Sequence, residues 1–188
     1  RRFTAALGGA RPVWLEQVHG VRAVRVGAAD ANGPSGPFLK ADASVTDERG
    51  VACAVLVADC LPVLFAAPDG RAVGAAHAGW RGLAGGVLEA TLQLVCELGH
   101  CRPAQVSAWL GACIGPQAFE VGEDVRQAFG PPGEAHFRPT GQPGKWWADL
   151  PGLARQRLDR AGCSGLSGGR WCTHRDASRF FSFRRTPV

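Results

Sequence analysis

Three apolar runs of strand length follow one another between residues 51 and 78, and they limit the folds open to this chain of 188 residues. The runs read VACAVLVA, LPVLFAA and RAVGAAHA, and polar or turn-forming residues separate them. A short continuous apolar run predicts a strand, and the first run predicts one that is buried on both faces. The segment GLAGGVLEATLQLVCELG follows with apolar residues at helical spacing and a closing glycine, so it predicts a helix. We therefore expect strands and helices to share one core.

The remaining segments mix strands and helices without regular alternation. The stretch PVWLEQVHGVRAVRV predicts two short strands joined at His19-Gly20, and residues 27–40 form a Gly/Pro-rich loop. The segments ADASVT and AQVSAWLGACIG predict strands, whereas GEDVRQAFG and ADLPGLARQRLDRAG predict helices closed by glycine. The last segment, RWCTHRDASRFFSFRR, predicts a strand, a loop and a strand. This pattern favours an α+β fold with mixed sheets in a single domain over residues 1–188.

The positive charge of the chain allows two interpretations. The net charge is +5, and the densest basic group spans residues 175–185 with Phe180, Phe181 and Phe183 between its arginines. Basic and aromatic residues together can bind nucleic-acid bases. We favour a terminal strand with a phenylalanine face in the core, because no nucleic-acid-binding motif accompanies the group. A pocket for an anionic small molecule such as phosphate explains basic residues equally well. A non-enzymatic basic binding module stays an alternative.

Several sequence features bear on the compartment. No apolar run is long enough to span a bilayer, and no segment has the pattern of a secretory signal. The seven cysteines form no CxxC pair and lie mostly in apolar surroundings, which favours reduced thiols and a reducing compartment. The chain begins at Arg1 without methionine, so we expect an N-terminal segment to be missing. We expect a cytoplasmic protein without a membrane partner, and the residues indicate no oligomeric state.

Three residues at breaks in the pattern are the main candidates for chemistry. His19 ends an apolar stretch, Cys60 stands between two apolar runs, and His77 ends the third run. Two imidazoles and one thiolate can hold zinc and leave its fourth position open, as catalytic zinc sites do. In the competing interpretation Cys60 is a nucleophile and one of the two histidines is its base. Each residue taken alone is more often structural than functional.

The surrounding motifs add three further candidates. His77 opens the segment HAGWRG, in which glycines permit a sharp turn and Arg81 stands at the start of the expected helix, an arrangement suited to phosphate. Asp59 precedes Cys60 between two apolar runs, and a charged residue there needs a partner or a pocket. Glu120 lies in the Gly/Pro-punctuated segment GACIGPQAFEVG. We consider Asp59 or Glu120 as proton carriers.

Together these motifs resemble one family. The segments QVHG, VADCLPVLF, AHAGWRGLAGGVLEAT, GACIGPQAFEVG, ADLPGLARQRL and FFSFRR occur in that order and closely resemble the YfiH-type family, also called multicopper polyphenol oxidases or laccase-domain proteins. The resemblance implies a cytoplasmic enzyme with two sheets flanked by helices, layered α/β/β/α. It also implies a metal site formed by His19, Cys60 and His77. Phe183 departs from the family, which has tyrosine in this motif.

The resemblance implies several activities. Members are assigned zinc-dependent purine nucleoside phosphorylase activity on adenosine, inosine, guanosine and methylthioadenosine, together with adenosine deaminase activity. Purine nucleosides and phosphate would then be the partners, without nucleic acid, and one zinc ion per chain the cofactor. The alternatives are a hydrolase that edits a peptidoglycan precursor and a laccase-like polyphenol oxidase that uses copper. Five histidines are too few for a conventional multicopper set, and redox-inert zinc favours hydrolysis or phosphorolysis.

Overall fold

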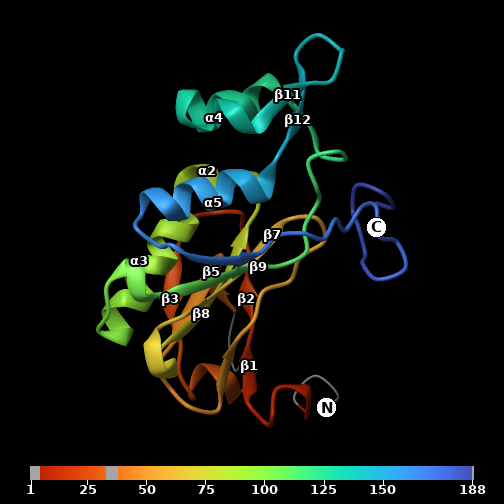
Figure 1. Cartoon of the computed structure of the whole chain (residues 1–188). Helices are drawn as coiled ribbons and strands as arrows, with labels where there is room; N and C mark the ends of the chain where they lie inside the picture. Colours follow the sequence, from red (N-terminus) through yellow and green to blue (C-terminus); the bar gives the residue numbers. More distant parts are fainter. Residues whose placement is uncertain (1–4, 33–37, 188) are drawn as a thin grey trace.

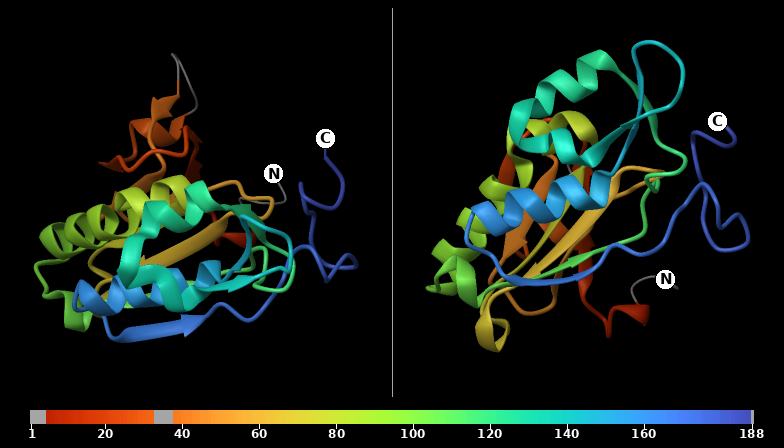
Figure 2. Two further views of the ribbon diagram at one scale, coloured as in Figure 1. Left: turned by 90° about the horizontal axis from the view of Figure 1, so that it is seen from above. Right: turned by 45° about the horizontal axis from the view of Figure 1, so that its top comes forward.

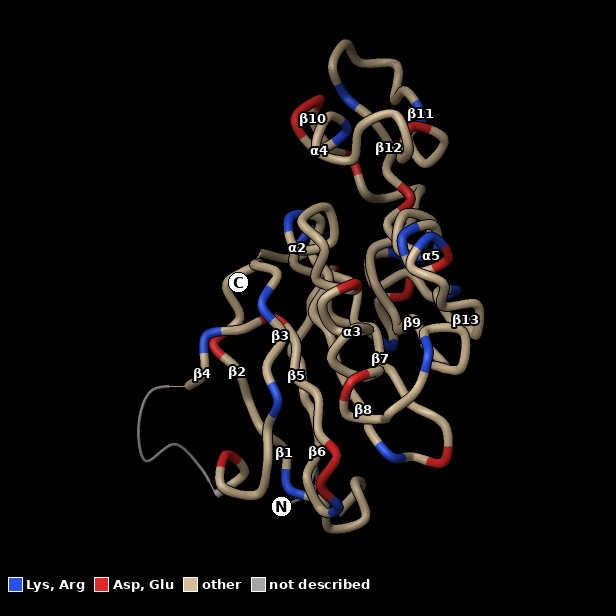
Figure 3. The backbone as a smooth tube through the Cα atoms, turned by 90° about the vertical axis from the view of Figure 1, so that its left-hand side faces the viewer, with Lys and Arg blue, Asp and Glu red and all other residues tan. Residues whose placement is uncertain are grey.

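The protein is described here by a computed structural model that covers residues 5–32 and 38–187. Part of the loop expected over residues 27–40 therefore lies outside the described residues. Within the described ranges, no helix has the length and apolar character needed to cross a membrane. Lysine and arginine are spread over many elements of the backbone instead of being concentrated on one (Figure 3).

A six-stranded mixed sheet forms the centre of the molecule (Figure 1). Its two middle strands are the second and third apolar runs, and they pair antiparallel. Their outer neighbours also pair antiparallel to them, whereas the two edge strands run parallel to their partners. In spatial order the strands are β13 (Gly165–Gly168), β9 (Ser107–Leu110), β7 (Leu61–Ala66), β8 (Val73–Ala78), β5 (Ala43–Thr46) and β3 (Ala23–Arg25).

Two helices lie side by side on one face of this sheet, α3 (Val87–Gly99) and α5 (Leu150–Arg160) (Figure 2). Helix α3 directs Leu88, Leu92 and Val95 into the core, and their helical spacing is the one that the sequence predicts. Burying such a side chain stabilises the fold by roughly 1.5–3 kcal/mol. The helix expected over residues 82–99 is nevertheless two helices. Gly86 has a left-handed φ of 107° and ends α2 (Trp80–Gly85) before α3 begins.

A smaller unit of one helix and one sheet lies above α5 in Figure 1. Helix α4 (Glu123–Gly133) packs on a three-stranded antiparallel sheet made of β10 (Glu120–Gly122), β12 (Lys145–Ala148) and β11 (Phe137–Pro139). Its apolar residues belong to the same hydrophobic cluster as the central sheet. The expected combination of mixed sheets and helices around a shared core is therefore confirmed.

The remaining elements are short. Two two-stranded parallel sheets pair β1 (Arg11–Val13) with β6 (Val51–Cys53) and β2 (Leu15–Glu16) with β4 (Leu39–Lys40). Single 3-10 turns connect other elements, at Asp30–Asn32, Pro68–Gly70, Pro103–Gln105 and Glu134–His136.

The first apolar run departs from its prediction. Only Val51–Cys53 form a strand, and the rest of the run over residues 54–58 is irregular, with Leu56 66% exposed. The cause is a side chain that replaces a neighbouring strand. The side-chain amide of Gln17 donates a hydrogen bond to the carbonyl of Leu56 at 2.9 Å. It also accepts one from the backbone N–H of Leu56 at 2.7 Å. Both backbone groups of Leu56 are therefore satisfied outside a sheet.

The C-terminal prediction was also wrong. The last segment forms turns and loops at one side of the molecule (Figure 1), and Phe181 is 90% exposed instead of lying in the core. Some of its hydrogen bonds close local turns, because the Asp176 carboxylate accepts from the side chains of Ser178 and Arg179. A side chain that bonds within its own turn competes with strand pairing. Only Cys172 keeps a single bridge, to Cys113.

Candidate active site

Cys60 and His77 are brought together by the pairing of the two middle strands. Cys60 immediately precedes β7, and His77 lies at the penultimate position of β8. The strands are antiparallel, with Pro62 opposite His77 and Leu61 opposite Ala78, so the start of one lies beside the end of the other. Residues alternate between the two faces of a strand, which places the two site residues on the same face of the sheet.

His19 reaches this point through a loop that a buried carboxylate holds. Asp42 is fully buried, and its carboxylate accepts hydrogen bonds from the backbone N–H groups of Val18, His19 and Gly20 at 3.2, 2.9 and 2.7 Å. His19 itself adopts a left-handed backbone with φ of 59°. Non-glycine residues in this region cluster at functional sites, where the surrounding structure holds them. Here the carboxylate of Asp42 holds His19 in its left-handed conformation.

The three predicted ligands form one group. The Nε2 atom of His19 lies 3.9 Å from Sγ of Cys60, and the rings of His19 and His77 meet edge to face with centroids 4.7 Å apart. The ligand atoms of the three residues all lie within 4.8 Å of one another. Two nitrogen donors and one sulfur donor suit zinc, and copper also accepts this donor set. Among the residues that the structure describes, this is the one group of three or more such donors.

The same carboxylate orients His77. Nδ1 of His77 lies 2.8 Å from Oδ1 of Asp42, and both side chains are buried. Metal-binding histidines commonly donate their second ring N–H to a carboxylate, which leaves the other nitrogen for the ion. Burial lowers the pKa of His77 despite the opposing hydrogen bond to Asp42, which favours the neutral imidazole that ligates metals. Burial acts to raise the pKa of Asp42, but hydrogen bonds from His77 and three backbone groups outweigh it and lower this pKa.

Cys60 is protonated at neutral pH unless a cation is close. Burial, followed by the negative charges of Asp59 and Asp42, raises the pKa of its thiol to about 11. A thiol with so high a pKa supplies little thiolate and is a weak nucleophile. A metal ion reverses this balance, because a coordinating thiol loses its proton. The surroundings of Cys60 therefore favour ligation over the competing nucleophile interpretation.

Two glycines of HAGWRG allow the ligands to approach. A Cβ atom on Gly79 would lie 2.9 Å from Cδ2 of His19 and 3.0 Å from Sγ of Cys60, closer than side chains tolerate. A Cβ on Gly82 would lie 2.7 Å from the carbonyl oxygen of Gly20 in the His19 loop. These residues are therefore needed for close packing of the ligand loops. The donor set and this glycine-lined approach both fit a bound metal ion.

A cavity of about 420 Å³ opens beside His19 and Cys60. Its volume lies in the range of small-molecule sites. Three aromatic side chains and two arginines contribute to its wall, and one of these arginines is the predicted residue Arg81. The predicted residue Asp59 also lines the cavity. The lining residues are His19, Ala58, Asp59, Cys60, Trp80, Arg81, Ile114, Phe119, Leu150, Phe183 and Arg184.

The other predicted residues are placed differently. Arg81 is exposed, and its guanidinium stacks 4.4 Å from the centroid of the Trp80 ring. The Asp59 carboxylate already accepts hydrogen bonds from three donors of the C-terminal segment. Glu120 does not line the cavity, and its carbonyl oxygen accepts a hydrogen bond from Arg184 at 2.8 Å. Helix α2 is only six residues long, so we place no anion on its start.

Sequence reasoning missed several residues of the cavity wall, and two of them, Phe183 and Arg184, come from the C-terminal segment. The sequence predicts that this basic and aromatic segment forms a strand with a buried face. The signal was present in the alternation of aromatic and basic residues, a composition that suits a ligand as well as a core. The folded structure shows that Phe183 and Arg184 line the cavity instead of packing in the core.

The fold and the site together define a mixed α/β protein with one His2Cys centre beside a ligand-sized cavity. The chain belongs to the family described as multi-copper polyphenol oxidoreductase laccase, whose model matches residues 1–187. It is 49% identical to a purine nucleoside phosphorylase of Pseudomonas aeruginosa over 189 residues, which cover 99% of this chain and 73% of the relative. It is 45% identical to purine nucleoside phosphorylase YfiH of Escherichia coli, over 98% of this chain and 73% of that protein.

The fold is also found in solved structures. The crystal structure of a Neisseria meningitidis protein has a TM-score of 0.86 and 45% identity, with 98% of this chain and 74% of that one covered. The expected resemblance to the YfiH-type family and its fold is confirmed.

Proposed function

We propose that the protein is a zinc-dependent purine nucleoside phosphorylase with adenosine deaminase activity. One observation carries the proposal: a single cavity of about 420 Å³ combines two of the three candidate metal ligands, three aromatic side chains and two arginines. Aromatic walls suit a purine base, and guanidinium groups suit phosphate. The names of the P. aeruginosa and E. coli relatives support the same activity.

His19, Cys60 and His77 would hold one zinc ion per chain. Zinc supplies Lewis acidity and lowers the pKa of water when it is bound. Asp42 keeps the protein side of this centre in place, since it contacts the backbone of His19 and the ring of His77. Copper is the alternative ion, and its support is the description of the family.

The substrates that we propose are adenosine, inosine, guanosine and methylthioadenosine. Trp80, Phe119 and Phe183 would enclose the purine, and Arg81 would orient phosphate toward C1′ of the ribose. In phosphorolysis a C1′–O bond forms to phosphate, and the C1′–N9 bond breaks with its electron pair on the base. The proton that phosphate gives up ends on the base. In deamination water replaces the 6-amino group, which leaves as ammonia.

The carboxylates considered as proton carriers receive different assignments. The Asp59 carboxylate is occupied by three hydrogen-bond donors, so we assign it to holding the wall of the cavity. Glu120 can carry a proton only if its side chain moves toward the cavity. Its carbonyl oxygen is already close to the cavity wall, because it accepts a hydrogen bond from Arg184.

The test is direct. Purified protein loaded with zinc is incubated with inosine and phosphate, and products are separated by chromatography. Hypoxanthine and ribose 1-phosphate are the expected products, and Cys60→Ala should abolish their formation. A chain that releases no base from any of the four nucleosides contradicts the proposal.

Two other enzyme activities and one binding activity serve as comparisons. The family description favours a polyphenol oxidase, but a single group of three donors among the described residues falls short of a multicopper set. Copper-loaded protein that oxidises a phenol and consumes oxygen would support it. Mass loss from a peptidoglycan precursor would support an editing hydrolase. Salt-dependent affinity for nucleic acid without turnover would support a basic binding module.

We further propose a cytoplasmic location, without a membrane or nucleic-acid partner. All seven cysteines are free thiols, which fits a reducing compartment.

A further inference from the structure

The C-terminal segment, residues 172–185, folds against the cavity and supplies part of its wall. We call this segment the C-terminal cap. It forms turns instead of a strand, and Phe183 and Arg184 of the cap line the cavity. The cap begins more than a hundred residues after Asp59 in sequence, so specific contacts must hold it there.

Asp59 is the main anchor of the cap. Its Oδ1 accepts a hydrogen bond from the Thr173 hydroxyl at 2.6 Å. Its Oδ2 accepts from the Ser182 hydroxyl at 3.0 Å and from the backbone N–H of Arg184 at 2.7 Å. Asp59 has a left-handed φ of 90°, a costly conformation for a residue with a side chain. The carboxylate next to the ligand Cys60 thus holds both ends of the cap.

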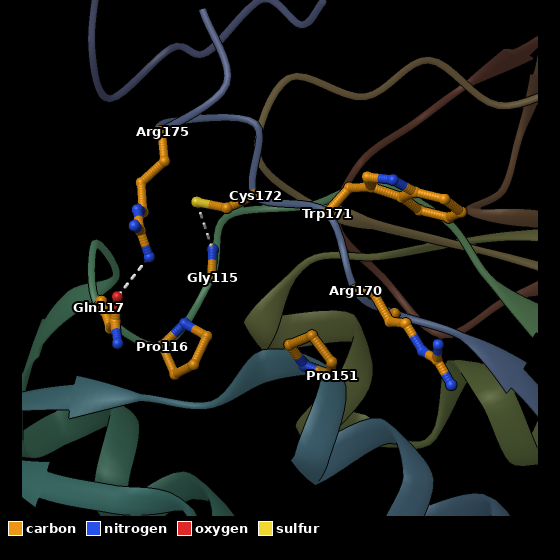
Figure 4. Close-up of a pocket in the computed structure, with 9 residues that line it drawn as sticks. Gly115, Pro116, Gln117, Pro151, Arg170, Trp171, Cys172 and Arg175 are labelled. Carbon is orange, nitrogen blue, oxygen red and sulfur yellow. Dashed lines mark hydrogen bonds between the residues drawn. The ribbon is translucent and has the colours of Figure 1, made fainter.

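Further contacts stiffen the cap. The guanidinium of Arg185 donates to the carbonyls of Thr173, His174 and Phe180 at 2.7, 2.8 and 2.7 Å. A second pocket, of about 220 Å³, lies between the cap and the loop that carries Ile114 of the cavity wall (Figure 4). There Sγ of Cys172 accepts a hydrogen bond from the Gly115 N–H at 3.2 Å.

Arg175 makes the other contact across this second pocket. Its guanidinium points toward Gln117 and donates a hydrogen bond to the side-chain carbonyl (Figure 4). The cap is therefore tied to two separate loops of the cavity wall, the one before β7 and the one after β9. Such fixation is what a binding residue on a long loop requires.

Arg184 is held but keeps hydrogen-bonding capacity. Its Nη1 donates to the carbonyl of Glu120 at 2.8 Å, and its guanidinium lies 5.6 Å from the centroid of the Phe119 ring. In the part of the chain that the structure describes, neither Arg184 nor Arg81 forms an ion pair with a carboxylate. A guanidinium has five N–H donors, so most of those on Arg184 stay available.

Two guanidinium groups on one cavity match a doubly charged anion. Arg81 comes from α2 and Arg184 from the cap, so they reach the cavity from separate elements. The Asp59 carboxylate in the same wall would repel an anion, but three donors already bind it. Arginine binds phosphate through two parallel N–H···O bonds, which also sets its orientation.

We propose that Arg184 is a phosphate-binding residue, which acts with Arg81, and that Asp59 is the positioning residue that holds it through the cap. The inference rests on the proposed phosphorolysis and names the subsite for its second substrate. The phosphate would sit between the two arginines while the purine occupies the aromatic part of the cavity.

The test compares Arg184→Gln and Arg184→Lys with the parent chain. Initial rates of inosine phosphorolysis are measured while phosphate and inosine are varied separately. Arg184→Gln should raise KM for phosphate at least tenfold and KM for inosine much less, and Arg184→Lys should recover part of the difference. Arg179→Gln is the matched control, because Arg179 belongs to the same cap but contacts Asp176 outside the cavity. It should leave both KM values unchanged.

Thr173→Val tests the positioning role of Asp59. The substitution removes one donor from its carboxylate while all metal ligands stay in place. We expect KM for phosphate to rise by a smaller factor than in Arg184→Gln, with zinc content equal to that of the parent chain. If Asp59 is only structural, Thr173→Val should lower the amount of active protein and leave KM for phosphate unchanged. That outcome would contradict the positioning role.

Direct binding of inorganic phosphate separates this inference from the proposed function. Phosphorus NMR line broadening is recorded during titration of the parent chain and of Arg184→Gln with phosphate alone. Weaker binding in the variant supports the subsite even when no nucleoside is cleaved, and only the phosphorylase proposal then fails. Equal phosphate binding and equal KM for phosphate in both proteins overturn the inference, whatever the activity.

Discussion

Oδ1 of Asp42 lies 2.8 Å from Nδ1 of His77, and the same carboxylate accepts the backbone N–H of His19. One buried side chain therefore orients two of the three candidate ligands, although it is not a ligand itself. Carboxylates in this position fix the ring orientation of a metal-binding histidine and raise its basicity. The geometry of the candidate metal centre therefore depends on Asp42 as well as on the three ligands.

Replacing Asp42 should weaken zinc binding without removing a ligand. Asp42→Asn keeps the shape but presents an amide NH2 to a ring or backbone N–H that needs an acceptor. We expect zinc affinity to fall by about 10–100-fold, the usual effect of losing such a partner. Competition with a chromophoric chelator measures it. Asp47→Asn is the control, since Asp47 pairs with Arg25 on the surface, and unchanged affinity in Asp42→Asn would refute the orienting role.

Adding one methyl group at Gly79 should damage the same centre by steric means. The new Cβ of Gly79→Ala would approach both His19 and Cys60 to about 3 Å, so the two ligands must separate. We expect less than a tenth of the zinc bound by the parent chain after dialysis against a weak chelator, measured by elemental analysis. Gly122→Ala is the control, because its Cβ meets only the exposed Asp124 carboxylate, which can rotate away. Full zinc content in Gly79→Ala would contradict the close approach.

Zinc binding should release a proton from Cys60. Burial and two nearby carboxylates raise the pKa of this thiol to about 11, so the metal-free protein holds the proton at neutral pH. Zinc affinity should then rise by about tenfold per pH unit below that pKa from this group alone. Calorimetry in buffers with different ionisation enthalpies counts the protons released. The count should fall by one in Cys60→Ser, and an unchanged count would show that Cys60 is not a ligand.

Truncating a buried leucine should lower the free energy of unfolding much more than truncating an exposed one. Leu88 is completely buried between α3 and the sheet, and Leu88→Ala should cost about 2–5 kcal/mol in the free energy of unfolding. Leu64 lies on the other face of the sheet with 44% exposure, so Leu64→Ala should cost much less. Urea denaturation followed by tryptophan fluorescence compares the two. Similar losses for both variants would contradict the assignment of the core.

Prediction from sequence succeeded where local pattern and burial agree. The runs that become β7 and β8 are apolar and end at polar residues, and α3 shows helical spacing throughout. It failed at residues 54–58, where hydrogen bonds from Gln17 replace a partner strand, and at the cap, where Asp176 organises turns. At residues 54–58 a polar side chain satisfies the backbone, and in the cap polar side chains bond to one another within a turn. Hydropathy reports neither kind of contact.

Periodicity and residue chemistry are local properties, so they predict the strand and helix pattern of the centre and the three residues at its breaks. The family resemblance rested on the same motifs. The contacts by which Asp42 orients His77 and Asp59 holds Arg184 at the cavity appear only in the folded chain. These contacts join residues 35 and 125 positions apart in the pairs His77–Asp42 and Arg184–Asp59. Strand register and a few buried hydrogen bonds create them, and neither is visible in local pattern.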